Sequence, residues 1–122
     1  MSGPDLTSFL RQEARGAAAE ANGCGRFVAR WYEARTGRKP LSGLLTRSDA
    51  HEAIGVYRAM CRAVAEEGLP RTDRPGPGDI GLVRAGNAVL AAICTGQGWA
   101  SMVADRLLIT RRVTVLRAWR LA

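Results

Sequence analysis

A segment rich in proline and glycine, residues 68–78, separates two parts of the chain that differ in their pattern of apolar residues. Three prolines and three glycines fall within it, and such a composition interrupts both helices and strands. Before this segment the apolar residues repeat every three or four positions, and after it they alternate or form continuous runs. The sequence therefore predicts a helical half over residues 1–67 and a strand half over residues 79–122, joined at 68–78.

Three helices are predicted in the first half, and each carries a signal at one of its ends. Their ranges are 5–21, 24–36 and about 48–66. Asp5 or Thr7 is placed to cap the first helix, and Gly37 is placed to end the second. Asp49 and Glu52 stand in a capping-box-like relation at the start of the third. The helices are thus expected to have apolar faces that pack against a sheet.

Four to five short strands are predicted in the second half. Their ranges are 79–83, 88–94, 99–103, 107–110 and 113–121. Residues 89–94 are apolar on both faces, which is typical of a central strand covered on each side. Helices that precede an antiparallel sheet give an α+β fold. A chain of 122 residues has room for one such domain, so residues 1–122 are predicted to form a single α+β domain.

The cysteines and the hydropathy pattern exclude several classes of protein. Cys24, Cys61 and Cys94 are odd in number and far apart, so no complete disulfide framework is expected. The first residues lack the apolar stretch of a secretory signal. Residues 85–104 carry no charge, but the turn at 95–98, with two glycines and two polar residues, interrupts them. We therefore expect no membrane span.

Four short motifs occur in an order that resembles a known group of proteins. They are Cys24-Gly25-Arg26-Phe27-Val28-Ala29-Arg30-Trp31, Gly78-Asp79-Ile80, Ala91-Ala92-Ile93-Cys94-Thr95-Gly96 and Arg117-Ala118-Trp119-Arg120. This order resembles the papain-like cell-wall endopeptidases of the NlpC type. It resembles more closely a small family of phage and prophage tail-associated proteins with the same outline. The resemblance implies N-terminal helices packed on an antiparallel sheet.

In the endopeptidases, a cysteine at the start of the first core helix is the nucleophile, and the resemblance places this role on Cys24. A thiol at a helix N-terminus lies near unpaired backbone N–H groups, which stabilise the thiolate. However, Cys24 also shares one helical face with Phe27, Val28 and Trp31. That spacing by itself favours a thiol packed in the core, whereas the resemblance favours a remnant or working nucleophile, so both interpretations stay open.

The catalytic base of the endopeptidases is missing from its expected place. Their histidine falls here on Leu90, and the aspartate that usually precedes the nucleophile falls on Gly23. The one histidine of the chain, His51, lies near the start of the third predicted helix. It could assist Cys24 only if that helix end folded against it. The resemblance therefore implies a degenerate peptidase, with His51 as a weak alternative base.

No metal or other cofactor is expected. Cys24, His51, Cys61 and Cys94 have separations unlike those of zinc motifs. Cys61 and Cys94 lie on apolar stripes, so both are predicted to be core residues.

The chain is basic, with a net charge of +7, and its last seventeen residues carry a cluster of arginines. The candidate contact surface comprises Arg106, Arg111, Arg112, Arg117, Trp119 and Arg120. No recognition helix or set of stacking aromatics accompanies this charge, so an acidic protein neighbour is favoured over nucleic acid. Trp99 and Trp119 would belong to the surface if exposed and to the core if buried.

These observations lead to one principal hypothesis and two rivals. The resemblance implies a structural protein of the virion, at the tail tip or baseplate of a phage or gene-transfer particle, in contact with a hub or distal tail protein. The alternative is an active thiol peptidase or amidase that acts on peptidoglycan, with Cys24 as nucleophile. The third is a basic module that binds nucleic acid.

Overall fold

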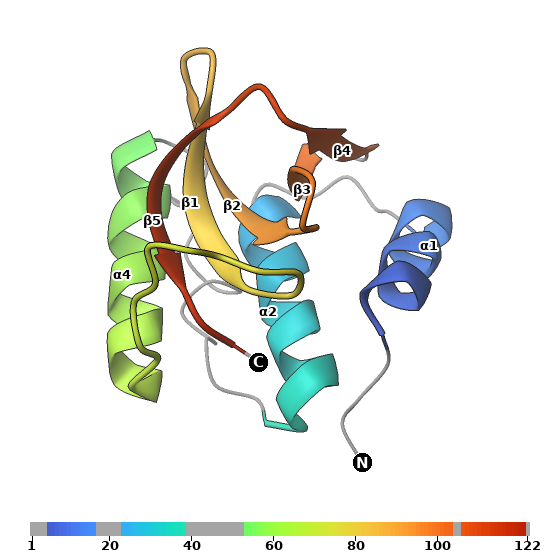
Figure 1. Cartoon of the computed structure of the whole chain (residues 1–122), viewed down its shortest axis with the longest axis horizontal. Helices are drawn as coiled ribbons and strands as arrows, with labels where there is room; N and C mark the ends of the chain where they lie inside the picture. Colours follow the sequence, from blue (N-terminus) through green and yellow to red (C-terminus); the bar gives the residue numbers. More distant parts are fainter. Residues whose placement is uncertain (1–4, 17–22, 39–52, 104–105, 122) are drawn as a thin grey trace.

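The computed structural model describes residues 5–16, 23–38, 53–103 and 106–121. Within them, three helices precede five strands (Figure 1). The helices are α1 (Leu6–Gly16), α2 (Gly23–Thr36) and α4 (Ala53–Glu67), and the strands are β1 (Ile80–Ala85), β2 (Ala88–Cys94), β3 (Trp99–Val103), β4 (Arg106–Thr110) and β5 (Thr114–Trp119). The prediction of an α+β fold is confirmed.

The five strands form one antiparallel sheet in the order β4-β3-β2-β1-β5. Strands β1 to β4 follow one another as hairpins, and β5 returns to pair with β1 on its far side. This makes β2 the central strand, as its run of apolar residues predicted. The register of β5 against β1 shifts between Leu82 and Val83, which bends this edge of the sheet.

The predicted caps are present at the start of α1 and at the end of α2. Asp5 accepts a hydrogen bond from the backbone N–H of Ser8 at 2.7 Å, and this bond lowers the pKa of the Asp5 carboxyl. Gly37 has φ +75° and donates its N–H to the carbonyl oxygen of Glu33 at 2.7 Å. Both are standard helix caps. Residues 17–22 and 48–52, where the first predicted helix ends and the third begins, lie outside the described residues.

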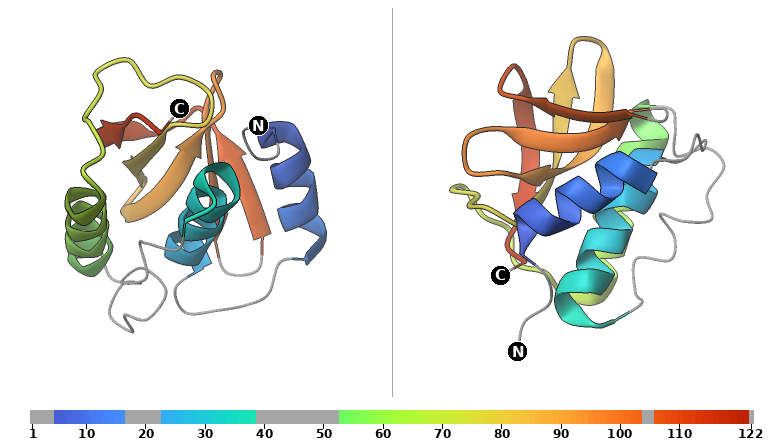
Figure 2. Two further views of the ribbon diagram at one scale, coloured as in Figure 1. Left: turned by 90° about the horizontal axis from the view of Figure 1, so that it is seen from below. Right: turned by 90° about the vertical axis from the view of Figure 1, so that its right-hand side faces the viewer.

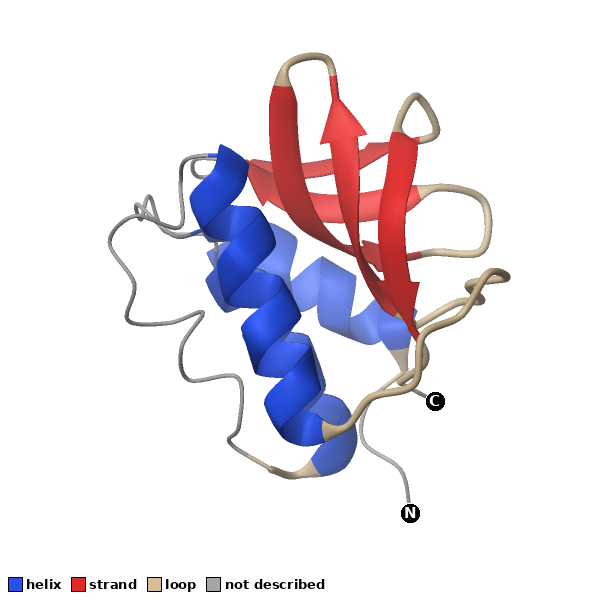
Figure 3. Ribbon diagram, turned by 90° about the vertical axis from the view of Figure 1, so that its left-hand side faces the viewer, coloured by secondary structure: helices blue, strands red, loops and turns tan. Residues whose placement is uncertain are grey.

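The helices cover one face of the sheet, and α2 lies between α4 and α1 (Figures 2 and 3). The main core lies between these layers. It comprises Phe9, Phe27, Val28, Ala29, Trp31, Tyr32, Val56, Ala59, Met60, Ala63, Val64, Ile80, Leu82, Ala91, Ile93, Ala100, Met102 and Trp119. A second cluster contains strand residues only: Val83, Ala92, Cys94, Trp99 and Ala118. We call the face of the sheet that carries this second cluster the outer face.

Polar contacts between helices supplement the core. Arg30 of α2 forms an ion pair with Glu13 of α1 at 2.6 Å. The hydroxyl of Tyr32 donates a hydrogen bond of 2.8 Å to Glu67, at the end of α4. Burial and the neighbouring Glu67 carboxylate raise the pKa of Tyr32. Helix α2 is therefore held by α1 on one side and by α4 on the other.

The segment at 68–78 is irregular, as predicted, but it also pairs with the end of β5. The N–H of Thr72 donates to the carbonyl oxygen of Ala118 at 3.0 Å, and that of Arg120 donates to Pro70 at 2.8 Å. The start of β1 and the end of β5 differ from the predicted strand bounds. β1 begins one residue after Asp79, and β5 ends at Trp119; beyond it the N–H of Arg120 donates to Pro70 and that of Leu121 donates to the Asp79 carboxylate.

Candidate functional site

Cys24 is the second residue of α2, so its thiol lies at the helix N-terminus, as predicted. Helix α2 packs on β2 and β3, and the thiol reaches the backbone of Ala91 in the middle of β2. The side chain is partly exposed and packs against the edge of the main core. Cys24 therefore has both features that the sequence predicted: it lies at the start of a helix and it packs at the margin of the core.

Burial raises the pKa of the Cys24 thiol above its ordinary value. The backbone groups of Ala91, Gly25 and Cys24 itself act in the opposite direction, with smaller effect. Across the described part of the chain, no titratable side chain contributes to this shift. Burial thus disfavours the thiolate, which is the form that a nucleophile requires.

Leu90, on which the resemblance places the catalytic histidine, faces away from Cys24. Successive residues of a strand point to opposite faces of a sheet. Ala91 and Ile93 belong to the main core beside the helices, whereas Leu90 packs against the second cluster on the outer face. A histidine substituted at Leu90 would thus point away from the thiol. The register that the resemblance implies does not bring a base to Cys24.

The weak alternative base, His51, lies outside the described residues, as do Asp49 and Glu52, which were predicted to cap its helix. The predicted turn at 95–98 joins β2 and β3. In this turn the side-chain oxygen of Gln97 accepts a hydrogen bond from Arg111.

The remaining two cysteines are structural. Cys94 is 5% exposed and belongs to the second cluster, which confirms the prediction of a core position. Its thiol donates to the carbonyl oxygen of Pro75 at 3.7 Å. Burial and the nearby charge of Asp79 raise its pKa. Cys61 of α4 is partly exposed at the margin of the main core.

Two members of the predicted contact surface do not face the solvent as that prediction required. Trp119 is only 3% exposed and belongs to the main core, because its position in β5 points toward the helices. Arg117 is half-buried, with its guanidinium 5.5 Å from the centre of the Tyr57 ring on α4. This cation–π contact holds Arg117 on the helix side. Trp99, at 6% exposed, is likewise buried.

The four remaining arginines are exposed, but they lie in two separate places. Arg106 begins β4, and Arg111 and Arg112 follow its end, so these three flank one edge strand. Arg120 lies beyond the end of β5, beside the segment at 68–78. The predicted surface is thus two smaller basic regions.

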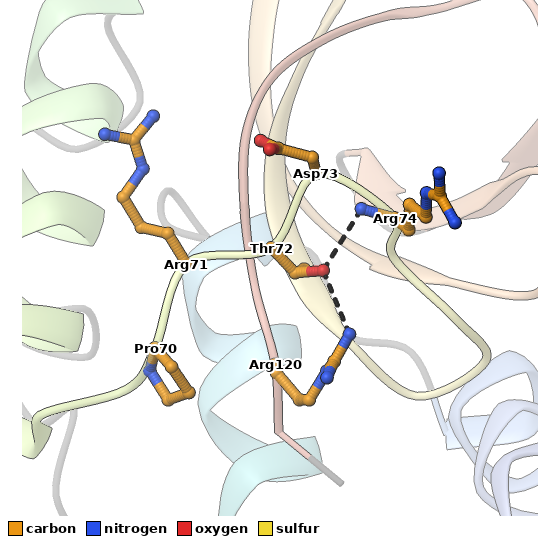
Figure 4. A pocket seen from close by; sticks show the side chains of 6 residues that line it. All are labelled: Pro70, Arg71, Thr72, Asp73, Arg74 and Arg120. Atoms are coloured by element: carbon orange, nitrogen blue, oxygen red, sulfur yellow. Dashed lines mark hydrogen bonds between the residues drawn. The ribbon is translucent and has the colours of Figure 1, made fainter.

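The region around Arg120 forms a pocket of about 320 Å³ (Figure 4). It is lined by Pro70, Arg71, Thr72, Asp73, Arg74 and Arg120. The Thr72 hydroxyl oxygen accepts hydrogen bonds from Arg120 at 3.2 Å and from the backbone N–H of Arg74 at 3.1 Å. The side chains of Arg71 and Arg74 point away from Thr72 on opposite sides (Figure 4). The three cations therefore do not converge on one point, as a built anion site would require.

Asp79 has a structural role that its motif alone did not indicate. Its carboxylate is buried, at 4% exposed. One oxygen accepts from the N–H of Gly76 at 2.9 Å and the other from the N–H of Leu121 at 3.0 Å. In the sequence, Asp79 was marked only as part of the motif Gly78-Asp79-Ile80. Its partner Leu121 is distant along the chain, so the motif did not indicate this contact.

Neither a metal centre nor a membrane-crossing helix occurs in the described ranges. Across those residues, no group of three or more His, Cys, Asp or Glu side chains could hold a metal ion. None of the helices described there has both the length and the apolar character needed to cross a bilayer.

Comparison with known proteins gives a family without a defined activity. No curated protein and no solved structure matches the chain. A family model described as "Domain of unknown function (DUF6950)" matches residues 4–121. Since this match covers nearly the whole chain, the protein belongs to the DUF6950 family.

Proposed function

We propose that this protein is a structural component of a phage or gene-transfer-particle tail tip or baseplate, and that it makes protein–protein contacts with a degenerate papain-like scaffold. Its partner on this proposal is a neighbouring tail protein, such as a hub or distal tail protein. The reason for proposing such a particle is the order of the motifs, which resembles that of the NlpC-type endopeptidases and of the phage tail-associated family. The observation that carries the choice of a structural role over catalysis is geometric: Cys24 packs at the margin of the main core, and Leu90 lies on the opposite face of the sheet.

A thiol hydrolase needs a thiolate, a base within hydrogen-bond reach and a group that orients the base. Burial instead favours the protonated form of Cys24. Leu90 lies on the outer face, where no side chain would reach the thiol. A scaffold that keeps the nucleophile position in this environment is better suited to interaction than to hydrolysis.

The exposed charges favour a protein neighbour over nucleic acid. Arg106, Arg111 and Arg112 lie around a strand with two exposed apolar residues, Leu108 at 40% and Ile109 at 55%. Arginine beside apolar surface is typical of protein interfaces. Six of the seven aromatic side chains are buried and Tyr57 is half-buried, so the protein offers no exposed aromatic platform for stacking bases.

Alkylation of the folded protein tests the catalytic alternative. We expect iodoacetamide to modify Cys24 slowly near neutral pH, and quickly once urea unfolds the chain. Cys61 is the internal reference, since it is also a partly exposed cysteine. Peptide mass spectrometry reports each cysteine separately. Rapid modification of Cys24 in the folded state would instead favour the thiol hydrolase, and peptidoglycan fragments would then be tested as substrates.

Particle purification tests the structural role itself. A tagged copy of the chain is produced in the cell that makes the particles, and intact tails are separated by density-gradient centrifugation. We expect the tag in the tail fraction, and its position at the tail tip by immunogold labelling. A Cys24→Ala variant should enter tails equally well. If the unaltered chain stays in the soluble fraction while tails assemble, the proposal is wrong.

A further inference from the structure

The outer face of the sheet carries exposed apolar side chains and lies opposite the face that the described helices α1, α2 and α4 cover (Figure 2). Val103, Leu108 and Val115 are 41%, 40% and 43% exposed. Trp99, Ser101 and Val103 are alternate residues of β3 and point to one face. Leu108 pairs with Ser101, and Val115 pairs with Val83 of the second cluster. Because side chains alternate between faces, all three lie on the same face as Trp99. Apolar groups grouped in this way favour contact with a partner.

A pocket of about 310 Å³ opens on this face. It is lined by Pro75, Cys94, Gly96, Gln97, Gly98, Trp99, Arg111, Val113 and Val115. Trp99, Val113 and Val115 give it apolar walls. Among the described residues that line it, Arg111 is the one that carries a charge, and its guanidinium donates to the Gln97 side-chain oxygen across a long 3.5 Å. A carboxylate would be a stronger partner for that guanidinium than this neutral oxygen.

Backbone contacts preform the pocket. In the turn between β2 and β3, the N–H of Thr95 donates to the carbonyl oxygen of Gly98 at 2.9 Å, and the N–H of Gly98 donates to the Thr95 hydroxyl at 3.0 Å. A Cβ on Gly98 would lie 2.7 Å from the carbonyl oxygen of Thr110. The turn therefore packs directly against the end of β4, which holds Gln97 close to Arg111. A preformed site loses little entropy when it binds.

We infer that this pocket receives an apolar side chain from an acidic segment of the partner protein, while Arg111 pairs with a carboxylate next to that side chain. The inference rests on the proposed function, because it names the place at which the neighbouring protein docks. The positive charge of the pocket and of the whole chain favours an acidic partner over a second copy of this chain. A second copy of this chain would bring a further +7 charge to a pocket whose lining already includes Arg111, whereas an acidic segment complements that charge.

A fluorescent peptide tests the pocket directly. The probe is a capped hexapeptide with two acidic residues, Leu-Phe and two more acidic residues, and its binding is followed by fluorescence anisotropy. We expect saturable binding that Arg111→Glu and Val115→Asp each weaken about tenfold or more. Arg111→Gln, which removes the charge without reversing it, should weaken binding less. Arg62→Glu on α4 is the matched control, since it makes the same charge change at an exposed site outside the pocket.

Two further measurements make the peptide test specific. A peptide with lysines in place of its acidic residues should not compete. In a ¹H–¹⁵N spectrum, the acidic peptide should shift the indole signal of Trp99, while that of Trp31, bonded to Gly78 inside the protein, stays in place. Equal binding by the unaltered chain and by Arg111→Glu, or competition by the lysine peptide, would overturn the inference.

Particle incorporation separates this inference from the proposed function. If Arg111→Glu and Val115→Asp fail to enter tails while Arg62→Glu enters, the pocket is the docking site. If all of these variants enter tails as the unaltered chain does, the pocket inference is wrong and the structural role stands. If the unaltered chain never enters tails, the structural role is wrong, and peptide binding alone then decides whether the pocket takes an acidic apolar segment.

Discussion

The indole nitrogen of Trp31 donates a hydrogen bond of 2.8 Å to the carbonyl oxygen of Gly78, and both groups are buried. Gly78 in turn donates its N–H to the carbonyl oxygen of Cys94 at 2.8 Å. Helix α2 is thereby tied, through the end of the proline- and glycine-rich segment, to the central strand β2. A substitution at Trp31 therefore loosens the contact between the two halves of the fold.

Trp31→Phe should lower the free energy of unfolding by roughly 2–4 kcal/mol. It leaves the buried carbonyl of Gly78 without its donor and opens a small cavity beside Phe9, whose ring centre lies 5.1 Å from that of Trp31. Urea unfolding followed by circular dichroism measures the change. Tyr32→Phe is the control on the same helix: it removes only a part-buried hydrogen bond to Glu67 and should cost about 0.5–1.5 kcal/mol. Equal losses for the two variants would contradict this role of Trp31.

Asp79→Ala should destabilise the protein by roughly 2–4 kcal/mol, because the N–H groups of Gly76 and Leu121 both lose their acceptor. Asp79→Asn should lie between the alanine variant and the unaltered chain, since the two N–H groups face different carboxylate oxygens and asparagine replaces one of these with an NH₂ donor. Hydrogen exchange at the Leu121 amide should become faster in both. Asp73→Ala, at an exposed carboxylate, should change stability by less than about 0.5 kcal/mol.

Gly81→Ala should destabilise the protein by about 1–3 kcal/mol or more. A Cβ at this position would lie 2.7 Å from the carbonyl oxygen of Arg117 and 2.9 Å from the Trp99 ring, and the backbone oxygen of the neighbouring strand has no room to move. Thermal unfolding measures the effect. Gly86→Asn is the comparison, because Gly86 has φ +61° with open space around it and asparagine tolerates that conformation. The Gly81 inference fails if both variants melt alike.

The stability of the protein should fall as the pH rises above the ordinary thiol value of 9.0. Burial raises the pKa of the Cys24 thiol in the folded state, so in this range the unfolded chain loses its proton first and is favoured. Below the unfolded value both states are protonated, and the contribution of the thiol to stability is fully retained. Burial raises the pKa of Cys94 as well, so that residue adds to the same trend.

Unfolding free energies of the unaltered chain and of Cys24→Ala, measured between about pH 8 and pH 10, isolate the Cys24 contribution. The decline should be shallower in Cys24→Ala, because alanine does not ionise. Cys94→Ala provides the matched comparison for the second raised thiol. Parallel curves for Cys24→Ala and the unaltered chain would show that the Cys24 thiol has the same pKa in the folded and unfolded states.

Local patterns predicted the elements whose signals are complete within a few residues. The ranges predicted for the second and third strands, 88–94 and 99–103, match β2 and β3, since their runs of apolar residues are bounded by turn residues on each side. Helix α2 likewise ends beside Gly37, whose positive φ closes the helix. These elements depend on neighbours in the sequence, so the sequence is sufficient to place them.

The faces of the strands could not be assigned in the same way. Trp99 and Trp119 each lie in a strand with apolar residues on both sides, so the sequence left open whether either was exposed. Pairing with β1 directs Trp119 toward the helices, and the space above Gly81 receives the ring of Trp99. The register between strands decides such questions, because a shift of one residue moves every side chain to the other face.

The sequence by itself determined the fold class, the division at residues 68–78 and the position of Cys24 at a helix start, because periodicity, turn residues and caps act locally. Only the tertiary structure decided that Cys24 packs against the backbone of Ala91, that Leu90 faces away from it, and that Arg111 lies beside Trp99 and Val115. Each of these relationships joins residues from different elements. They depend on how helices and strands pack and pair, which no local pattern encodes.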